Sequence, residues 1–369
     1  MKLKKLFLHT LSIFIVILLL FSTSFCFATT ENDSINVAAP VALLMDANTG
    51  KILYEKNAYE KVYPASTTKI MTAILALENR ELSHIAKVSY NSIFTVPIGY
   101  ANANLQLDEE LTIEQLLKVL LIPSANDAAN VIAEDIGGSV ESFASMMNTK
   151  ASEIGCTNTH FVNPNGVHDE NHYSCAYDLA LMGKYAMRNE TFRNIVSTVR
   201  YTLPVTNKYD KADRIFLTTN KLINEKSGQF YKYTTGIKTG YTDAAKNCIV
   251  ASAKKDDMEL IVVIMGASND NSSSNKFIDC VTLFNYGFEN YSYKTLYSKN
   301  SVYKVITPRN ADSKSKDLNV LIEDDINVLL NKTDYDTNFV PTVNLDSKLK
   351  APITKGSVIG TISYDILRY

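Results

Sequence analysis

The sequence is poor in cysteine. Its 369 residues include five, of which Cys156, Cys175, Cys248 and Cys280 lie beyond the first 28 residues, and none belongs to a C-x-x-C pair. A disulfide scaffold needs a denser set, so apolar cores must hold the chain together, and 46% apolar residues suffice for them. The flanks NCIVAS and FIDCVTL are typical of strand and helix interiors. We therefore expect buried free thiols, with one disulfide in an exported protein as the alternative.

Positive charge is not in excess either. Lys and Arg number 37 against 39 Asp and Glu, and loss of residues 1–28 would leave 34 against 39, a formal charge of −5. A nucleic-acid-binding surface needs a basic patch, so the composition predicts no nucleic-acid partner. The sequence has no internal repeat and no low-complexity segment. Its length is sufficient for one large domain and one smaller domain.

The N-terminus is typical of a secretory signal peptide. Lysines at positions 2, 4 and 5 precede an apolar stretch from about Leu11 to Phe21, and Cys26-Phe27-Ala28 places small residues at both recognition positions. The sequence predicts cleavage after Ala28 and export to the outer face of the cytoplasmic membrane, the cell wall or the medium. An uncleaved segment that anchors the chain in the membrane is the alternative.

The apolar pattern predicts an α+β domain over residues 37–291. Two apolar runs around Asp-Ala-Asn-Thr-Gly, at 41–54, indicate a β-hairpin. A helix from Ser66 to about Glu78 is apolar nearly all round and should be buried. Residues 112–190 are mainly helical, and from about Val199 antiparallel strands lead to a helix over roughly 274–288. This order predicts an antiparallel sheet built from both ends of the domain, with helices packed against it.

The composition changes past Tyr291. Short alternating runs such as SVYKVIT and LNVLIED are separated by turns rich in Asn, Asp, Lys and Pro. They predict a small all-β domain over residues 300–369, with a boundary near 292–300.

Ser66 and Lys69, in YPASTTKIMT, match the pattern Ser-x-x-Lys. The pattern alone decides nothing, because Ser is a favoured helix N-cap and the spacing recurs at Ser273/Lys276, Ser301/Lys304, Ser313/Lys316 and Ser347/Lys350. Two further elements single out the first match. Ser124-Ala125-Asn126 lies between predicted helices and Lys238-Thr239-Gly240 lies in a predicted strand, in the order that acyl-transferring serine enzymes use. The similar triplets Ser298-Lys-Asn300 and Lys226-Ser-Gly228 fall in predicted turns.

The first element has the residue types that nucleophilic catalysis needs. A serine hydroxyl requires an adjacent base, and positions i and i+3 of a helix share a face, so Lys69 can reach Ser66. Lysine is a base only when neutral, which burial and a nearby cation such as Lys238 favour. The helix N-terminus also directs free N–H groups at a developing oxyanion.

The other two elements supply the remaining groups. Ser124 is placed to relay a proton to a leaving amine, and Asn126 to hold a substrate amide or the lysine. Lys238 and Thr239 offer a charge and a hydroxyl to a substrate carboxylate. Gly240 would let an extended substrate approach the strand edge and form backbone hydrogen bonds.

With YPASTTKIMTAILALE, LLIPSANDAANVIAE, HFVNPNGVHDENHYSCAYDLALM and TTGIKTGYTDAAKNCIVASA, the chain closely resembles the serine-type D-alanyl-D-alanine carboxypeptidases of peptidase family S11. These are low-molecular-weight penicillin-binding proteins. The resemblance runs from about Val37 to Tyr291, and the β-rich tail resembles the C-terminal domain of the family. It implies the penicillin-binding, serine β-lactamase-like fold, with an antiparallel sheet and helices on both faces, followed by the small β domain.

The resemblance also implies an activity and residue roles. Ser66 would be acylated by the penultimate D-alanine of peptidoglycan stem peptides or by β-lactams, with Lys69 as base and Ser124 as proton relay. Lys238 would be a substrate-binding cation, and the backbone N–H groups of Ser66 and Tyr241 would form the oxyanion hole. No metal or cofactor is implied.

Three departures from the family pattern stand out. An arginine is common after the last long strand, where GASNDNSSSNKF offers only Lys276, which keeps the charge but lacks the bidentate fork. Tyr241 stands where some relatives have His. The usual C-terminal amphipathic membrane helix is not found in TISYDILRY, so we expect that anchor to be absent or lost from this sequence.

Other functions remain open on the sequence alone. His168-Asp-Glu-Asn-His172 suggests a metal carboxypeptidase, although it lies in a predicted loop without an evident third ligand. A serine β-lactamase would need a carboxylate-activated water, for which Asp169 and Glu170 are the only nearby candidates. A non-catalytic wall-binding or sporulation protein would be expected to have lost at least one residue of the catalytic set. The sequence has all four of them: Ser66, Lys69, Ser124 and Lys238. The choice between a vegetative and a sporulation role is not predicted.

Overall fold

A computed structural model describes residues 35–211, 213–268, 275–313, 317–334 and 339–364. The expected signal segment, residues 1–28, and its cleavage site lie outside these residues. Within the described part of the chain, no helix combines the length and hydrophobicity that crossing a bilayer requires.

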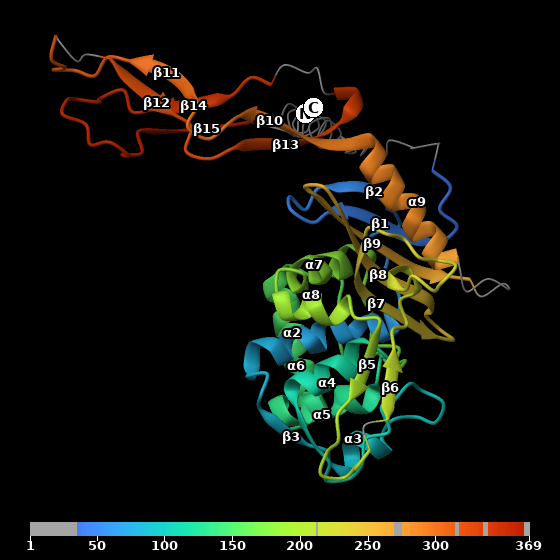
Figure 1. The fold of residues 1–369 in the computed structure, drawn as a ribbon. Helices are drawn as coiled ribbons and strands as arrows, with labels where there is room; N and C mark the ends of the chain where they lie inside the picture. Colours follow the sequence, from blue (N-terminus) through green and yellow to red (C-terminus); the bar gives the residue numbers. More distant parts are fainter. Residues whose placement is uncertain (1–34, 212, 269–274, 314–316, 335–338, 365–369) are drawn as a thin grey trace, which may run out of the picture. The chain divides into compact units, whose positions relative to one another are not determined.

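A five-stranded antiparallel sheet with the order β2-β1-β9-β8-β7 forms the centre of the larger domain (Figure 1). Its strands are β1 (Val41–Asp46), β2 (Ile52–Lys56), β7 (Thr234–Thr242), β8 (Lys246–Lys255) and β9 (Met258–Ala267). The predicted hairpin at 41–54 and the late strands are confirmed. Strand β7 pairs with β8 on one side and forms an edge of the sheet.

Helices cover both faces of this sheet, as the fold prediction requires (Figure 1). Ile261 and Leu260 are neighbours on β9 and therefore face opposite sides. A Cβ on Gly183 of α7 (Ala176–Ala186) would lie 3.8 Å from Ile261, whereas one on Gly287 of α9 (Asn275–Asn290) would lie 2.6 Å from Leu260. Burial on both faces explains why β1 is apolar up to its last residue, Asp46, and why nearly every residue of β9 is apolar.

The remaining helices are α2 (Lys69–Asn79), α3 (Tyr90–Phe94), α4 (Ile113–Leu121), α5 (Asn126–Gly137), α6 (Val140–Ile154) and α8 (Glu190–Val196). The sequence marks many of their ends. Thr112 and Gln115 form a capping box at the start of α4, and Gly138 and Gly155 end α5 and α6 in the left-handed conformation. Helix α8, capped by Asn189, was not predicted.

The predicted start of the helix at Ser66 is wrong by three residues. Ser66 lies in a 3-10 turn, η1 (Ala65–Thr68), and α2 begins only at Lys69. Neither segment has a side-chain cap, so Ser66 does not act as an N-cap. The predicted burial is confirmed, because Lys69 and the next seven residues of α2 are all buried.

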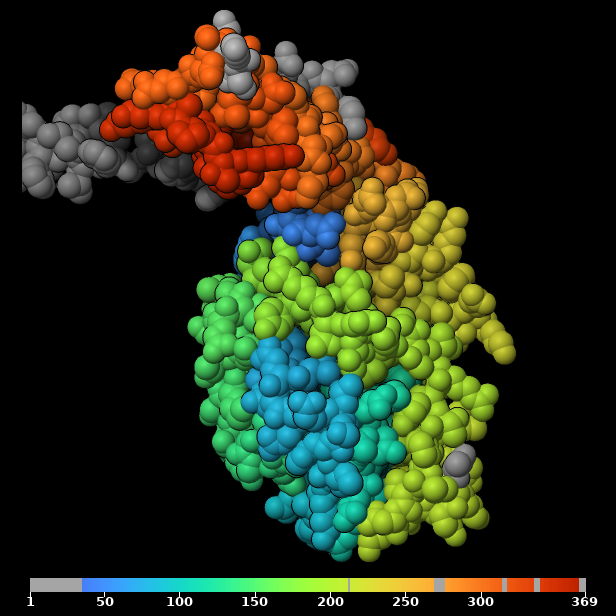
Figure 2. Space-filling model, turned by 60° about the vertical axis from the view of Figure 1, so that its left-hand side comes forward, coloured from blue at the N-terminus to red at the C-terminus, as the bar shows by residue number. Residues whose placement is uncertain are grey.

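Two small pairs of strands flank the helices. Strands β3 (Ile85–Lys87) and β4 (Glu110–Thr112) pair, as do β5 (Arg200–Leu203) and β6 (Arg214–Leu217), and a 3-10 turn η2 (Lys221–Ile223) follows. Asn207, in the loop of the β5–β6 hairpin, accepts a hydrogen bond from the backbone N–H of Glu110 at 2.8 Å. The hairpin therefore lies beside the segment around residue 110 on the molecular surface (Figure 2).

The C-terminal part is all β, as expected. It contains β10 (Tyr291–Tyr297), β11 (Val302–Ile306), β12 (Leu318–Leu321), β13 (Ile326–Asn331), β14 (Thr342–Leu345) and β15 (Gly360–Ser363), with a 3-10 turn η3 (Lys332–Asp334). The strands pair as β10-β13, β11-β12 and β14-β15. Strand β10 begins at Tyr291, directly after α9.

The four cysteines in the described residues are all buried and free, which confirms the expected thiols.

Candidate active site

Two glycines hold the backbone of Ser66 in place. A Cβ on Gly166 would lie 1.9 Å from the carbonyl oxygen of Ala65, and a Cβ on Gly240 would lie 2.9 Å from the backbone nitrogen of Ser66. Ala65 itself has a φ of 48°, in the left-handed region that non-glycine residues rarely adopt. Contact with these two segments therefore imposes the turn that presents Ser66.

Lys69 is fully buried, and its ammonium nitrogen has three oxygen neighbours. Nζ lies 2.9 Å from Ser66 Oγ, 2.7 Å from Asn126 Oδ1 and 2.6 Å from the carbonyl oxygen of Asn165. Burial lowers the pKa of Lys69 well below its ordinary value, and the nearby charge of Lys238 lowers it further. The buried Asp127 carboxylate opposes these effects in part. Lys69 is thus a buried amine in contact with the serine hydroxyl.

The loop that supplies the Asn165 carbonyl is held by polar contacts on both sides. Asn165 Nδ2 donates to Asn130 Oδ1 on α5 at 3.0 Å, and its Oδ1 accepts from the N–H of Val167 at 2.9 Å. Thr72, one turn after Lys69, donates to the carbonyl oxygen of Pro164 at 2.5 Å. These bonds join the loop to α2 and α5, the two helices that carry Lys69 and Asn126.

Asn126 starts α5 and connects it to a neighbouring loop. The carbonyl oxygen of Ala101 accepts from the Asn126 backbone N–H at 2.9 Å and from its Nδ2 at 2.7 Å. Since both donors are used this way, Asn126 Oδ1 is left facing Lys69. Ser124, two residues earlier, is 6% exposed and has a φ of 74°, a strained conformation for serine.

Asp127, the next residue of α5, holds the loop that contains Ala101. Its carboxylate accepts from the N–H groups of Ala103 at 2.9 and 3.0 Å and of Leu105 at 3.2 Å. Burial raises the pKa of Asp127, and these hydrogen bonds counteract the rise.

Lys238 and Thr239 lie on edge strand β7. Lys238 Nζ donates to the carbonyl oxygen of Thr239 at 2.9 Å, and burial together with the charge of Lys276 lowers the pKa of Lys238 to about 7. Thr239 Oγ1 lies 2.6 Å from Thr219 Oγ1. The next residues along the strand are Gly240 and the half-exposed Tyr241, whose hydroxyl donates to Asp243.

Lys276 lies on α9, behind the sheet rather than along the edge of β7. It is 8% exposed, and its Nζ donates to Asn247 Oδ1 at 3.0 Å. Asn247 is paired with Tyr241 across β7 and β8. Burial lowers the pKa of Lys276.

The structure thus brings some of the predicted site residues into direct contact with Ser66 or Lys69. Direct contacts join Ser66, Lys69 and Asn126, and Gly240 lies against Ser66. Lys238 acts on Lys69 through its charge. Among the described residues, no hydrogen bond connects the side chains of Ser124 or Lys276 to Ser66 or Lys69.

Sequence reasoning missed the supporting residues Asn165, Gly166, Asp127 and His172. In the sequence, Asn163-Pro-Asn-Gly166 indicates only a loop, and its Asn and Gly residues are the one signal of a supporting role. Gly240 was expected to make room for a substrate. The structure shows a second reason for glycine there, because a Cβ would meet the backbone of Pro64 and Ser66 and the side chain of Ala65 within 3.1 Å.

His172 does not fit the role of a metal ligand, because both of its ring nitrogens are hydrogen-bonded to the protein. Its Nδ1 accepts from the N–H of Val162 at 3.1 Å, so the neutral ring carries its proton on Nε2 and donates to Thr68 Oγ1 at 2.8 Å. Both nitrogens are therefore engaged by the protein. Within the described residues, no cluster of His, Cys, Asp and Glu could hold a metal ion.

Comparison with known proteins decides the family. The model of D-alanyl-D-alanine carboxypeptidases, peptidase family S11, matches residues 27–269, and the C-terminal domain of penicillin-binding protein 5 matches residues 291–367. The chain belongs to peptidase family S11. D-alanyl-D-alanine carboxypeptidase DacF of Bacillus subtilis is 35% identical over 332 residues, which are 88% of this chain and 80% of the relative.

Solved structures of the family agree with the fold. Streptococcus pneumoniae PBP3, a peptidoglycan synthesis regulatory factor, matches with a TM-score of 0.75 at 26% identity, over 89% of this chain and 93% of the other. Penicillin-binding protein 5 of Haemophilus influenzae matches with a TM-score of 0.71 at 26% identity over the same shares. The resemblance is therefore confirmed, together with the fold class and the serine-type carboxypeptidase activity that it implies.

Proposed function

We propose that this family S11 enzyme removes the terminal D-alanine from peptidoglycan stem pentapeptides through an acyl-enzyme on Ser66. The observation that carries the proposal is the buried Lys69 amine, 2.9 Å from the Ser66 hydroxyl and in contact with two carbonyl oxygens. A neutral amine has two N–H bonds and one lone pair. With the N–H bonds donated to Asn126 Oδ1 and the Asn165 carbonyl, the lone pair faces Ser66 Oγ and accepts its proton.

Acylation then follows in two steps. Ser66 Oγ attacks the carbonyl carbon of the penultimate D-alanine while its proton passes to Lys69. The oxyanion is held by the backbone N–H groups of Ser66 and Tyr241. Ser124 relays a proton to the nitrogen of the terminal D-alanine, the C–N bond breaks, and an ester to Ser66 remains.

Substrate binding uses the edge of the sheet. In the part of the chain that the structure describes, strand β7 has no neighbouring strand on its outer side, so an extended peptide can add to it through backbone hydrogen bonds beside Gly240. Lys238 and Thr239 bind the terminal carboxylate, and Lys276 contributes positive charge from behind Asn247. Asn126 orients the peptide amide as well as Lys69.

Water completes the cycle by attacking the ester. The D-alanine carbonyl leaves as a carboxylate and Ser66 recovers its proton. A β-lactam acylates the same serine, and because its ring-opened leaving group stays attached, the ester persists. The β-lactamase alternative has little support here, since Asp169 and Glu170 are both exposed and the neighbour of Lys69 in this loop is a backbone carbonyl.

We also propose export through the N-terminal segment, with cleavage after Ala28. N-terminal sequencing of the cell-derived protein tests this: a start at Thr29 supports cleavage. A start at Met1 in the membrane fraction would instead favour retention through an uncleaved signal segment.

A D-alanine release assay on a pentapeptide ending in D-Ala-D-Ala tests the activity. Wild-type protein should release one equivalent of D-alanine per peptide, and Ser66→Ala should release none. Ser301→Ala is the matched control, because Ser301 belongs to a second Ser-x-x-Lys pair and lies in a turn of the C-terminal domain, where its hydroxyl contacts the Ser298 carbonyl. Rapid penicillin hydrolysis without D-alanine release would contradict the proposal.

A further inference from the structure

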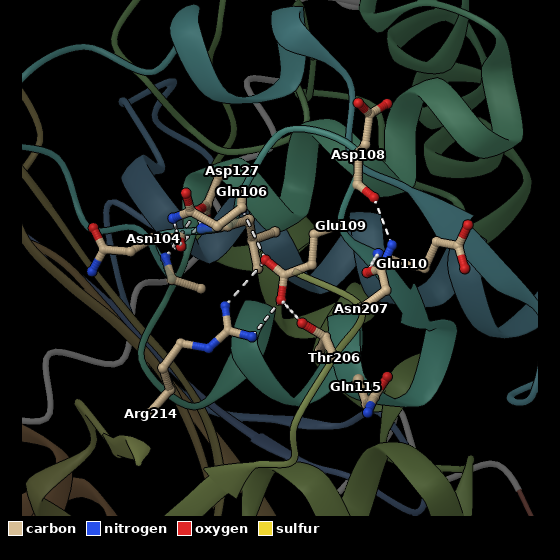
Figure 3. Close-up of polar contacts among 12 residues, drawn as sticks. Asn104, Gln106, Asp108, Glu109, Glu110, Gln115, Asp127, Thr206, Asn207 and Arg214 are labelled. Carbon is tan, nitrogen blue, oxygen red and sulfur yellow. Dashed lines mark hydrogen bonds and ion pairs between the residues drawn. The ribbon is translucent and has the colours of Figure 1, made fainter. Parts of the chain in front are cut away.

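A buried ion pair lies outside the group of residues that perform the chemistry. Glu109 is completely buried and the Arg214 side chain is 7% exposed (Figure 3). Glu109 Oε1 accepts from Arg214 Nη2 and from Thr206 Oγ1, the latter at 2.6 Å. Its Oε2 accepts from Arg214 Nη1 at 3.2 Å and from the N–H of Gln106 at 2.8 Å. The carboxylate therefore joins its own segment, residues 106–109, to the β5–β6 hairpin at Thr206 and Arg214.

The pair is ionised despite its burial. Burial pushes the pKa of Glu109 upward, but hydrogen bonds from Arg214 and Thr206 outweigh it and bring the pKa below its ordinary value. The Arg214 guanidinium also lies 4.5 Å from the centre of the Tyr209 ring. Buried ion pairs add little net stability compared with apolar packing, so their value is more often geometric.

On one side the pair leads to Lys69. Gln106 and Glu109 close the segment that begins at Ala101, and the Asp127 carboxylate holds that segment at Ala103 and Leu105. Figure 3 labels Asp127, Gln106 and Glu109 in one view. The Ala101 carbonyl then orients the Asn126 amide, whose oxygen contacts Lys69.

On the other side the pair leads to the substrate strand. Arg214 is the first residue of β6, and the chain continues from β6 to Thr219. Thr219 donates its backbone N–H to the carbonyl oxygen of Ile122 at 3.2 Å, two residues before Ser124, and its hydroxyl contacts Thr239 at 2.6 Å. The residue Thr219, which follows the hairpin, thus contacts both the segment before Ser124 and β7.

A second pair of hydrogen bonds joins the same two segments, the β5–β6 hairpin and residues 106–110. Asn207 accepts from the N–H of Glu110 at 2.8 Å and donates to the carbonyl oxygen of Asp108 at 2.9 Å. Both contacts are drawn in the region shown by Figure 3. They are exposed, so the buried charge pair is the stronger constraint.

We propose that Glu109 and Arg214 are positioning residues for acyl transfer, which keep the Asn126 side and the Thr239 side of the site at the spacing that the reaction needs. The inference rests on the proposed function. Displacements of about 1 Å remote from the reacting atoms can slow a reaction about 100-fold. Because neither residue reaches the substrate, their loss should reduce kcat and the rate of acylation while leaving KM nearly unchanged.

Glu109→Gln is the central variant, because it keeps the shape of the side chain and removes the charge. The matched control is Glu259→Gln, which breaks the bidentate Arg193–Glu259 pair between α8 and β9, where Glu259 is also buried. Kinetics of D-alanine release and of acylation by a fluorescent penicillin are measured together with the temperature midpoint of unfolding. We expect Glu109→Gln to lower kcat and the acylation rate 10- to 100-fold, with KM changed less than 3-fold. Glu259→Gln should lower the midpoint and change neither rate more than 2-fold.

Two milder variants keep the test decisive if Glu109→Gln does not fold. Arg214→Lys keeps the charge but loses the fork, and Thr206→Val removes one hydrogen bond to Glu109, so each should slow acylation several-fold at unchanged KM. Folded variants that acylate as fast as wild type, or that slow no more than Glu259→Gln, overturn the inference alone. Wild-type protein that releases no D-alanine and takes up no penicillin overturns the proposed function, and with it this inference.

Discussion

The buried His172 makes the stability of the active-site helix depend on pH. Its Nε2–H donates to Thr68, between Ser66 and Lys69 in the chain, and its Nδ1 accepts from Val162. Burial, opposed in part by Asp169, lowers the pKa of His172 from 6.5 to about 3. Protonation would end the acceptor role of Nδ1, so a charged ring cannot keep both bonds.

The sign and size of the effect follow from this pKa. The unfolded chain takes up the proton first, near pH 6.5, so the contribution of His172 to stability is complete above that pH and is lost as the pH falls towards 3. The loss is about 1.4 kcal/mol per pH unit, or about 2 kcal/mol between pH 7 and pH 5. A total stability of roughly 5–15 kcal/mol makes this difference easy to detect.

Urea unfolding of wild type and His172→Gln at pH 7, 6 and 5 measures the effect. At pH 7 the variant should be less stable by about 2–3 kcal/mol, because it loses two buried hydrogen bonds and ring packing. That deficit should shrink by about 2 kcal/mol at pH 5. His168→Gln, in the same loop but exposed, is the control and should leave the pH dependence unchanged. A deficit for His172→Gln that stays constant to within about 0.5 kcal/mol would refute the reasoning.

Two other substitutions test the placement of Ser66 and the charge of the pocket. Gly166→Ala would bring a methyl group within 1.9 Å of a backbone oxygen at a φ of 83°, so we expect about 2–4 kcal/mol of destabilisation and acylation of Ser66 slowed at least 10-fold. Gly228→Ala, which meets no atom within 4 Å, should change neither. Burial, together with the charge of Lys276, lowers the pKa of Lys238 to about 7, and Lys276→Gln removes the second of these causes. Because carboxylate binding requires charged Lys238, the alkaline limb of kcat/KM should move to higher pH, and an unmoved limb would contradict this electrostatic role.

Much of the fold could be predicted because its signals are local. The hairpin at 41–54, the glycines that end α5 and α6, and the capping box of α4 each depend on a few neighbouring residues. The two-sided burial of β1 and β9 is visible as continuous apolar runs. The short α8 was missed because its seven residues offer little periodicity beyond the Asn189 cap.

The supporting parts of the site could not be predicted, because they depend on contacts between distant segments. Ser66 lies in a 3-10 turn rather than at a helix start, since Gly166 and β7 press against Ala65 and Ser66 from a hundred or more residues away. The Asn165 carbonyl that faces Lys69 is a backbone atom, which no side-chain motif can reveal. Lys276 matched the expected charge, but only the packing of α9 placed it behind Asn247.

The central claim is that Ser66 is the nucleophile. Peptide mass spectrometry after treatment of wild-type protein with a fluorescent penicillin tests it most directly. We predict one covalent adduct, on the peptide that contains Ser66, and its loss in Ser66→Ala. Label on another residue, or a folded wild-type protein without label, would contradict the account.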